Sequence, residues 1–319
     1  MSRAAAAFFG VVGFVCASLF AQSEPASLTG AYSDTVSVGY VMIPFTALGS
    51  HGLPITDLRR TEFKLFVDGN PVRSDMFEKS QEEPVSFTIL LDCSGSMALA
   101  GKMNAALAAV GALIAHRHRG DDFSLYVFDD TGEHELVPFT EDPGKITAAL
   151  ANIHPYGKTA FFDALAKMPE RSKLGRNPSR AIILLSDGID NNSKLARSDL
   201  ERMLEGIAVP IYSLGIRDAA EGEKLDPKHP NEALSDIELL DEVATLTGGR
   251  MYLGERPNEL AQAVATLETH LRAQYLIGFT PTGQGAVKYR RISLKLAGGR
   301  IRSVRVRAGY MGTEPPRSR

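Results

Sequence analysis

The sequence contains little of several residue types that specialised proteins require. Two cysteines cannot form a disulfide framework, and there is no tryptophan to anchor an interface. The formal net charge of −3 argues against a dedicated nucleic-acid-binding protein, which carries a strongly basic surface. Of the 319 residues, 44% are hydrophobic and 23% are charged, so the chain is globular rather than disordered, collagen-like or polytopic in a membrane. This length suffices for about two domains.

Only the N-terminus contains an apolar run of membrane-spanning length. Residues 1–22 contain Arg3, then an apolar stretch over 4–20, and then the small residue Ala21 at a suitable cleavage position. We predict a cleaved signal peptide, and therefore an exported protein of the periplasm, the cell envelope or the secreted fraction. The alternative is an uncleaved anchor, because about 17 apolar residues just suffice to cross a bilayer. Membrane contact is expected only in that case.

Strand-like and helix-like stretches alternate through the middle of the chain. Residues 86–91 and 180–185 are almost continuously apolar, as in strands that are buried on both faces. Further strands are expected over 123–128, 210–215 and 250–253. Helices are expected over 103–114, 142–153, 161–168, 194–207, 235–246 and 260–271. The alternation predicts an α/β fold with a doubly wound, mostly parallel sheet and helices on both faces.

Both flanks of this region have β patterns. Strands are expected over 36–45 and 62–67 in the N-terminal flank. In the C-terminal flank, the alternating residues 288–296 are followed by Gly298 and Gly299, so we predict a hairpin in which 301–306 pairs back.

The flanks define the expected domain organisation. Neither flank is large enough to bury a core alone, because a single hairpin is marginally stable. We therefore predict that the α/β domain is inserted into one small β accessory domain, built from both chain ends. The predicted segments are a signal peptide over 1–22, a β-rich segment over 30–83, the α/β domain over 84–272, a β segment over 273–312 that packs with 30–83, and a frayed tail over 313–319.

Oxygen-bearing side chains occur in three separate loops of the α/β region. Asp92, Ser94 and Ser96 come directly after the strand 86–91, Thr159 lies in a later loop, and Asp187 follows the strand 180–185. Binding sites of open parallel sheets form outside the carboxyl ends of the strands, so these loops are candidates for one edge. Hydroxyl and carboxylate oxygens suit a hard cation such as Mg²⁺, which prefers six oxygen ligands. The sequence therefore predicts a weak, incomplete metal site that leaves a position for water or a partner oxygen.

These loops resemble those of the von Willebrand factor A domain with its metal-ion-dependent adhesion site. That site has the pattern Asp-x-Ser-x-Ser, followed by a Thr and then an Asp in later loops. The matching residues in order are Asp92, Ser94, Ser96, Thr159 and Asp187. The resemblance covers about residues 85–272 and implies that these residues hold Mg²⁺, with Mn²⁺ and Ca²⁺ as the other candidates. It also implies a protein partner that offers a carboxylate to the metal.

The flanks resemble bacterial exported proteins that are related to von Willebrand factor A. The resemblance rests on the segment Glu-Phe-Lys-Leu-Phe-Val-Asp-Gly at 62–69 and on Gln-Tyr-Leu-Ile-Gly-Phe-Thr-Pro at 274–281. It supports export and the accessory strands more than it specifies a function.

Other interpretations of the same loops are weaker. The segment 92–96 alone fits a capped helix start, because Ser and Asp are good caps. Gly157 and Lys158 before Thr159 suggest a phosphate-binding loop, but Asn152 stands where that motif needs a glycine, so no nucleotide is expected. Cys93 is expected to be a small buried apolar residue rather than a reactive thiol.

The leading hypothesis is an exported, non-enzymatic protein that binds a protein partner through a metal ion. The rest of the interface is expected from the loops 97–102, 129–135, 155–159 and 188–193. A metal-dependent hydrolase is the second hypothesis, although neither Gly-x-Ser-x-Gly nor His-Glu-x-x-His occurs in the sequence. The third is a structural component of the envelope whose metal stabilises the fold.

Overall fold

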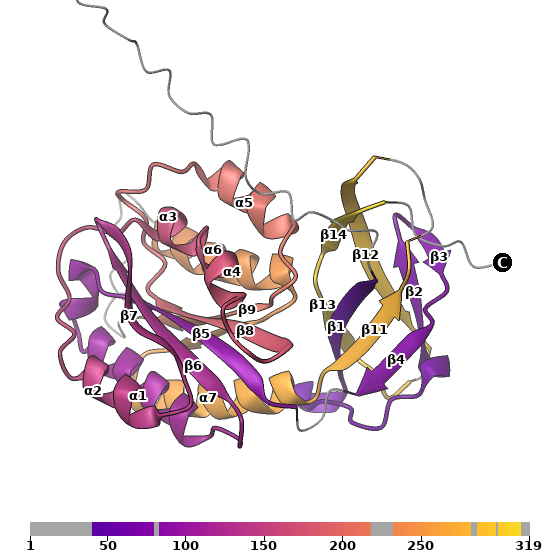
Figure 1. Cartoon of the computed structure of the whole chain (residues 1–319), viewed down its shortest axis with the longest axis horizontal. Coiled ribbons are helices and arrows are strands. Elements are labelled where there is room, and N and C mark those ends of the chain that lie inside the picture. Colours follow the sequence, from indigo (N-terminus) through magenta and orange to yellow (C-terminus); the bar gives the residue numbers. More distant parts are fainter. Residues whose placement is uncertain (1–39, 80–82, 218–231, 282–285, 298, 314–319) are drawn as a thin grey trace, which may run out of the picture. The chain divides into compact units, whose positions relative to one another are not determined.

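The structure is a computed structural model that describes residues 40–79, 83–217, 232–281, 286–297 and 299–313 (Figure 1). The predicted signal peptide over 1–22 lies outside the described residues, as does nearly all of the predicted tail. In the part of the chain that is described, no helix is both long and apolar enough to cross a membrane.

A six-stranded sheet forms the centre of the α/β region, with the order β10-β9-β8-β5-β6-β7. Five strands run parallel to one another: β5 (Val85–Asp92), β6 (Asp122–Asp129), β8 (Ser179–Ser186), β9 (Ile211–Ile216) and β10 (Met251–Gly254). The sixth, β7 (Gly132–Thr140), pairs antiparallel with β6 at the edge. The doubly wound, mostly parallel sheet that the sequence predicts is therefore confirmed. The pattern does not predict β7, because most of its residues are solvent-exposed or half-buried and only Gly132 and Val137 are buried.

Helices cover both faces of this sheet (Figure 1). One face carries α1 (Lys102–Ala115), α2 (Pro143–Leu150) and α7 (Pro257–Arg272). The other carries α3 (Phe161–Leu165), α4 (Met168–Ser172), α5 (Arg197–Glu205) and α6 (Glu232–Thr247). Successive residues of β5 point to opposite faces, so Ile89 and Leu91 pack with the first group and Leu90 packs with the second. This double burial explains the continuous apolar run in the sequence.

Four of the predicted helices differ clearly in extent from the observed ones. The helix predicted over 142–153 ends at Leu150, and the helix predicted over 194–207 is α5, Arg197–Glu205. The predicted helix over 161–168 is two short helices, α3 and α4, and the helix predicted to start at Ser235 begins earlier, at Glu232. The start of α2 agrees with the sequence: the Asp142 carboxylate caps it by accepting a hydrogen bond from the Gly144 N–H at 2.9 Å.

The accessory region consists of two four-stranded sheets with the orders β13-β1-β11-β4 and β14-β12-β2-β3. The N-terminal flank supplies β1 (Val41–Leu48), β2 (Phe63–Val67), β3 (Asn70–Val72) and β4 (Met76–Lys79). The C-terminal flank supplies β11 (Tyr275–Phe279), β12 (Lys288–Leu296), β13 (Ser303–Val306) and β14 (Gly309–Gly312). Strands of the two flanks pair directly, β1 with β11 and β2 with β12. Accessory sheets built from both chain ends are thus present, as expected.

The predicted hairpin between 288–296 and 301–306 is wrong. β12 pairs with β2 and β14, whereas β13 pairs with β1 in the other sheet. A separate two-stranded ribbon would bury little apolar surface. By joining different sheets, the two strands contribute to one core, in which Phe45 and Phe63 pack with Ile292. Phe45 and Phe63 have ring centroids 5.4 Å apart in this core.

Candidate metal site

The candidate site lies at the carboxyl ends of β5 and β8, which are neighbouring parallel strands. Leu91 of β5 is paired with Leu185 of β8, so the residues that follow, Asp92 and Ser186, are adjacent. The Ser186 hydroxyl donates a hydrogen bond to Asp92 Oδ2 at 2.6 Å. Parallel pairing therefore brings together two segments that are 94 residues apart in the chain.

Asp92 is a carboxylate with no exposed surface. Its Oδ1 accepts a hydrogen bond from the backbone N–H of Ser94 at 2.9 Å, which holds the loop after β5 in a tight turn. Burial, and then the nearby charge of Asp187, raise the pKa of Asp92 to about 7. Two buried carboxylates that repel each other form a site that is stabilised by added positive charge.

Ser94 and Ser96 offer hydroxyl oxygens beside Asp92. Ser94 is buried, Ser96 is half-buried, and their Oγ atoms lie 3.0 Å apart. Neighbouring ligands of an octahedral Mg²⁺ at 2.0–2.1 Å from the ion are themselves roughly 3 Å apart. The separation of the two hydroxyl oxygens therefore fits adjacent positions around one hard cation.

The segment that contains Thr159 is hydrogen-bonded to both of the other loops. The Gly157 carbonyl accepts from the Gly95 N–H at 3.0 Å, which ties the segment to the loop after β5. The Thr159 N–H donates to Asn191 Oδ1 at 2.9 Å, and the Thr159 carbonyl accepts from the N–H groups of Asn191 and Asn192. Thr159 itself is buried. The three loops predicted to share one edge of the sheet thus meet there.

Glycine is needed at position 157 for two reasons. Its φ of +81° lies in the left-handed region, and a Cβ atom would lie 2.6 Å from Asp130 Oδ1. A side chain here would strain the backbone and displace the Asp130 carboxylate.

A buried lysine also reaches the site. Lys102, the first residue of α1, places its Nζ 3.1 Å from Asp187 Oδ2, and the two side chains are only 2% and 4% exposed. The sequence places Lys102 in an exposed interface loop over 97–102, and this placement is wrong for Lys102. In the same segment Met97 is buried, whereas Leu99 is 61% exposed.

Part of the α/β region matches a known domain family. Residues 87–189 match the von Willebrand factor type A domain. Among curated proteins, none matches the sequence. The matched region includes all five candidate ligands, from Asp92 to Asp187.

Three solved structures share parts of the fold at low sequence identity. A von Willebrand factor type A protein from Catenulispora acidiphila is 17% identical, with a TM-score of 0.49 over 88% of this chain and 74% of that one. The von Willebrand factor domain of the type V pili tip protein Mfa5 from Porphyromonas gingivalis is 14% identical, with a TM-score of 0.45 over 58% and 93% of the two chains. The PilB minor pilin from Streptococcus sanguinis is 12% identical, with a TM-score of 0.43 over 60% and 62%.

The chemistry of the donor set in the von Willebrand A region suits a hard cation. Within the described part of the chain, no group of three or more His, Cys, Asp or Glu side chains could hold a metal ion. A cation at this edge would therefore need the hydroxyl oxygens of Ser94, Ser96 and Thr159 in addition to the carboxylates. Oxygen-only ligands of this kind fit Mg²⁺, Mn²⁺ or Ca²⁺ rather than zinc or copper.

Other acidic side chains near the loops of the von Willebrand A region have structural roles. The Asp190 carboxylate accepts from the Phe161 N–H at 2.9 Å, and the Asp163 carboxylate accepts from the N–H groups of Lys194 and Leu195. Asn191 does not begin a helix, since α5 starts only at Arg197, and instead it holds Thr159 in place. Ser186 and Lys102 contact the candidate ligands Asp92 and Asp187, and neither is among the ligands that the sequence predicts. Ser186 adjoins Asp187 and was detectable from the loop, but the inward direction of Lys102 was not.

Cys93 lies between two candidate site residues, Asp92 and Ser94. It is buried, and its thiol hydrogen-bonds to the His154 carbonyl, with Sγ and O 3.3 Å apart. Burial, followed by the charges of Asp129 and Asp92, raises the pKa of the Cys93 thiol to about 11. A thiol with this pKa is almost fully protonated at neutral pH, so Cys93 contributes a small apolar side chain.

Proposed function

We propose that this chain is an exported, non-enzymatic binding protein whose metal-ion-dependent adhesion site engages an acidic residue of a protein partner. The residues that would hold the cation are Asp92, Ser94, Ser96, Thr159 and Asp187. The observation that carries the proposal is the meeting of their three loops at one sheet edge, where the Ser186 hydroxyl binds Asp92 at 2.6 Å and the Ser94 and Ser96 oxygens lie 3.0 Å apart.

Each of these residues has a distinct task. When bound, a hard divalent cation supplies a Lewis-acidic position that accepts a carboxylate oxygen. Asp92 and Asp187 supply the negative charge that attracts the cation, and Ser186 keeps Asp92 in place by donating to Oδ2. Ser94, Ser96 and Thr159 contribute neutral oxygens, so the site does not cancel the full charge of the ion. The remaining positive charge favours an acidic side chain of the partner.

Two exposed apolar side chains lie next to the candidate ligands in the chain and extend the proposed contact surface. Leu99 is 61% exposed, and its N–H donates to the Ser96 carbonyl at 3.2 Å. Tyr156 is 80% exposed, and its N–H donates to the Cys93 carbonyl at 2.8 Å. A single metal contact confers little specificity, and large apolar side chains commonly carry the energy of interfaces. We propose that the partner presents its carboxylate next to apolar residues.

Export is part of the proposal and rests on the signal-peptide pattern of residues 1–22. Contact with a membrane is proposed only if that segment is retained as an anchor.

A titration of the isolated protein with Mn²⁺ tests the metal site. The free Mn²⁺ that remains at each step is measured by electron paramagnetic resonance, and the titration should give a Kd of about 1 mM. Ser94→Ala should weaken binding by at least about tenfold, because it removes one ligand and the partner of the Ser96 hydroxyl. Ser198→Ala, which changes an exposed serine of α5, is the matched control and should bind as the wild type does. Equal binding by Ser94→Ala would rule out this site.

Crosslinking tests whether a partner protein binds through the metal ion. A photoreactive amino acid at the exposed position 98, introduced into the protein expressed in its native cells, should capture a protein in Mg²⁺ and lose it in excess EDTA. Asp187→Ala should also lose it. Capture that persists in excess EDTA would count against the metal bridge, whatever the isolated protein binds.

A further inference from the structure

Lys102 brings a positive charge into the same site that would receive the cation. Its side chain is 2% exposed, and its Nζ lies 3.1 Å from Asp187 Oδ2, in an ion pair whose acidic side chain is 4% exposed. The pair joins residues that are 85 positions apart in the sequence. It therefore forms only when the fold brings the start of α1 beside the residue that follows β8.

The position of Lys102 is electrostatically unfavourable unless an acid compensates for it. Lys102 is the first residue of α1, and the positive end of the helix dipole opposes a cation there. Removing an ammonium group from water adds a further cost. A surface lysine could avoid both costs by extending into solvent, but Lys102 points inward, where the carboxylate of Asp187 compensates for its charge.

We propose that Lys102 is a built-in counter-cation of the candidate site, which neutralises Asp187 in the metal-free protein and competes with a divalent ion for the same carboxylate. This inference rests on the proposed function and adds to it the residue that sets the metal affinity. Asp92 and Asp187 repel each other, so the ammonium stabilises the metal-free fold. The same ammonium repels an incoming dication, because both charges would lie within a few ångströms of Asp187 Oδ2. Lys102 thus weakens metal binding.

Lys102→Met is the direct test. Methionine is unbranched, similar in length and compatible with a helix, but it carries no charge. We expect Lys102→Met to bind Mn²⁺ at least about tenfold more tightly than the wild type, in the same Mn²⁺ titration followed by electron paramagnetic resonance at fixed ionic strength. Lys158→Met is the matched control: it removes the same charge from an exposed loop position beside Thr159, and its affinity should stay within about twofold of the wild type.

Thermal melting provides a second readout that does not depend on the affinity measurement. Without metal, Lys102→Met should melt at a lower temperature than the wild type, because Asp187 loses its buried partner. Saturating Mn²⁺ should close most of this gap. Lys102→Arg keeps the positive charge and should keep the weak metal affinity. If Lys102→Met folds only in the presence of Mn²⁺, the inference is supported; if it does not fold at all, Lys102→Gln replaces it in both measurements.

The outcomes separate the inference from the proposed function. If the wild type binds Mn²⁺ and Lys102→Met binds it equally well, the counter-cation is overturned and the metal site stands. If only Lys102→Met binds, the ammonium fills the site and the proposed function of the wild type fails. If neither protein binds, while both are folded, the metal site and the inference built on it are both overturned.

Discussion

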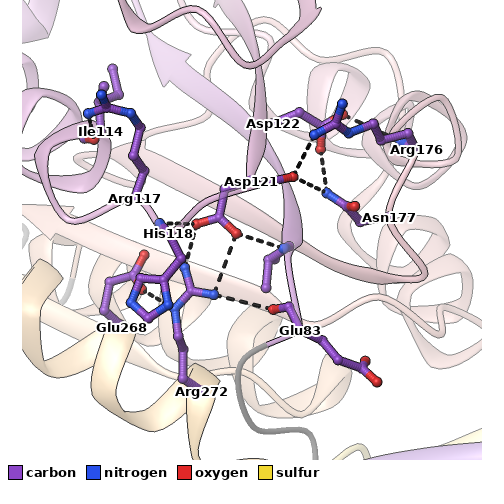
Figure 2. Close-up of polar contacts among 12 residues, drawn as sticks. Glu83, Ile114, Arg117, His118, Asp121, Asp122, Arg176, Asn177, Glu268 and Arg272 are labelled. Carbon is purple, nitrogen blue, oxygen red and sulfur yellow. Dashed lines mark hydrogen bonds and ion pairs between the residues drawn. The ribbon is translucent and has the colours of Figure 1, made fainter.

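Arg272, the last residue of α7, forms an ion pair with Asp121, and its Nη2 lies 2.5 Å from Asp121 Oδ2 (Figure 2). The Asp121 side chain is fully buried, and the Arg272 side chain is 12% exposed. The same carboxylate accepts hydrogen bonds from the backbone N–H groups of Val85 at 2.8 Å and His118 at 2.7 Å. One carboxylate therefore connects the end of α7, the start of β5 and the segment after α1. This network lies at the amino ends of the parallel strands, away from the candidate site.

Asp121→Ala should strongly destabilise the fold. It leaves a largely buried arginine without this partner and removes the acceptor of two backbone N–H groups, a combination that costs about 3–5 kcal/mol. The free energy of unfolding, measured in urea by circular dichroism, checks this. Glu170→Ala breaks the exposed pair with Lys173 and is the control, with an expected loss below about 1 kcal/mol. Similar losses in the two variants would contradict the role assigned to Asp121.

His270 should make the fold less stable in acid. Its ring nitrogens are both engaged, Nδ1 with the Tyr252 hydroxyl at 2.9 Å and Nε2 with the Gly52 carbonyl at 3.1 Å. Since a carbonyl only accepts, we assign the proton to Nε2 and the acceptor role to Nδ1. Burial first, and then the charge of Arg250, lower the pKa of His270 below its usual value of 6.5. The unfolded chain thus takes up the proton more readily than the native state does.

The sign of the pH dependence follows from that difference. Where the unfolded state binds more protons, stability rises with pH, so the contribution of His270 is present above about pH 6.5 and is lost as the pH falls toward its folded pKa. His270→Gln removes this contribution. The loss of stability between pH 7.5 and 5.5 should therefore be smaller in His270→Gln than in the wild type, in urea unfolding at each pH. The exposed His116→Gln is the control for a histidine change at the surface. An unchanged pH dependence in His270→Gln would count against the assignment.

Short-range patterns in the sequence predict a strand or helix well where the burial of its own residues defines it. The run 86–91 predicts a strand covered on both faces, and Ile89 and Leu90 do face different cores. Strand β7 escapes prediction because an edge strand with an exposed face has a weak apolar pattern. The wrong hairpin shows a different limit: residues 288–296 are correctly read as a strand, but their partner β2 lies in the distant N-terminal flank.

The sequence likewise predicts one part of the candidate site and not another. Motif order suffices to propose Asp92, Thr159 and Asp187 as neighbours, and their loops do meet. Motif order does not predict a role for Lys102, because a lysine at a helix start is normally solvated. Its inward direction brings it to Asp187, which is 85 positions away. Long-range electrostatics of this kind require the folded structure.

The exposed apolar residues beside the site should govern partner binding without affecting the metal. Leu99→Ser and Tyr156→Ala should each reduce chelator-sensitive capture of the partner by about tenfold, as for residues near the centre of an interface. Neither side chain offers an oxygen that the proposed site uses, so Mn²⁺ affinity should not change. Leu174→Ser is the matched control, because Leu174 is 64% exposed and belongs to the segment after α4. If Leu174→Ser lowers capture as much as Leu99→Ser does, the effect is not specific to this surface.

Cys93 should resist thiol reagents in the folded protein. With its pKa raised to about 11 by burial, the reactive thiolate is on the order of a hundred times rarer at pH 8 than in an unfolded chain. Reaction with a chromogenic disulfide reagent should therefore be slow in buffer and fast in urea, in a protein that starts after residue 22. Cys93→Ser supplies the baseline, since Cys93 is then the single cysteine. Fast labelling of the folded protein would indicate a reactive thiol after all.

Substitutions at Thr159 test the metal contact without disturbing the loop. Its backbone N–H and carbonyl are bound by Asn191 and Asn192, so the loop does not depend on the hydroxyl for its position. Thr159→Val keeps the shape of the buried side chain and removes the oxygen, whereas Thr159→Ser keeps the oxygen and removes the methyl group. We expect Thr159→Val to weaken Mn²⁺ binding by at least about tenfold and Thr159→Ser to retain it within about threefold. The reverse order would show that packing at position 159, rather than an oxygen ligand, controls the site.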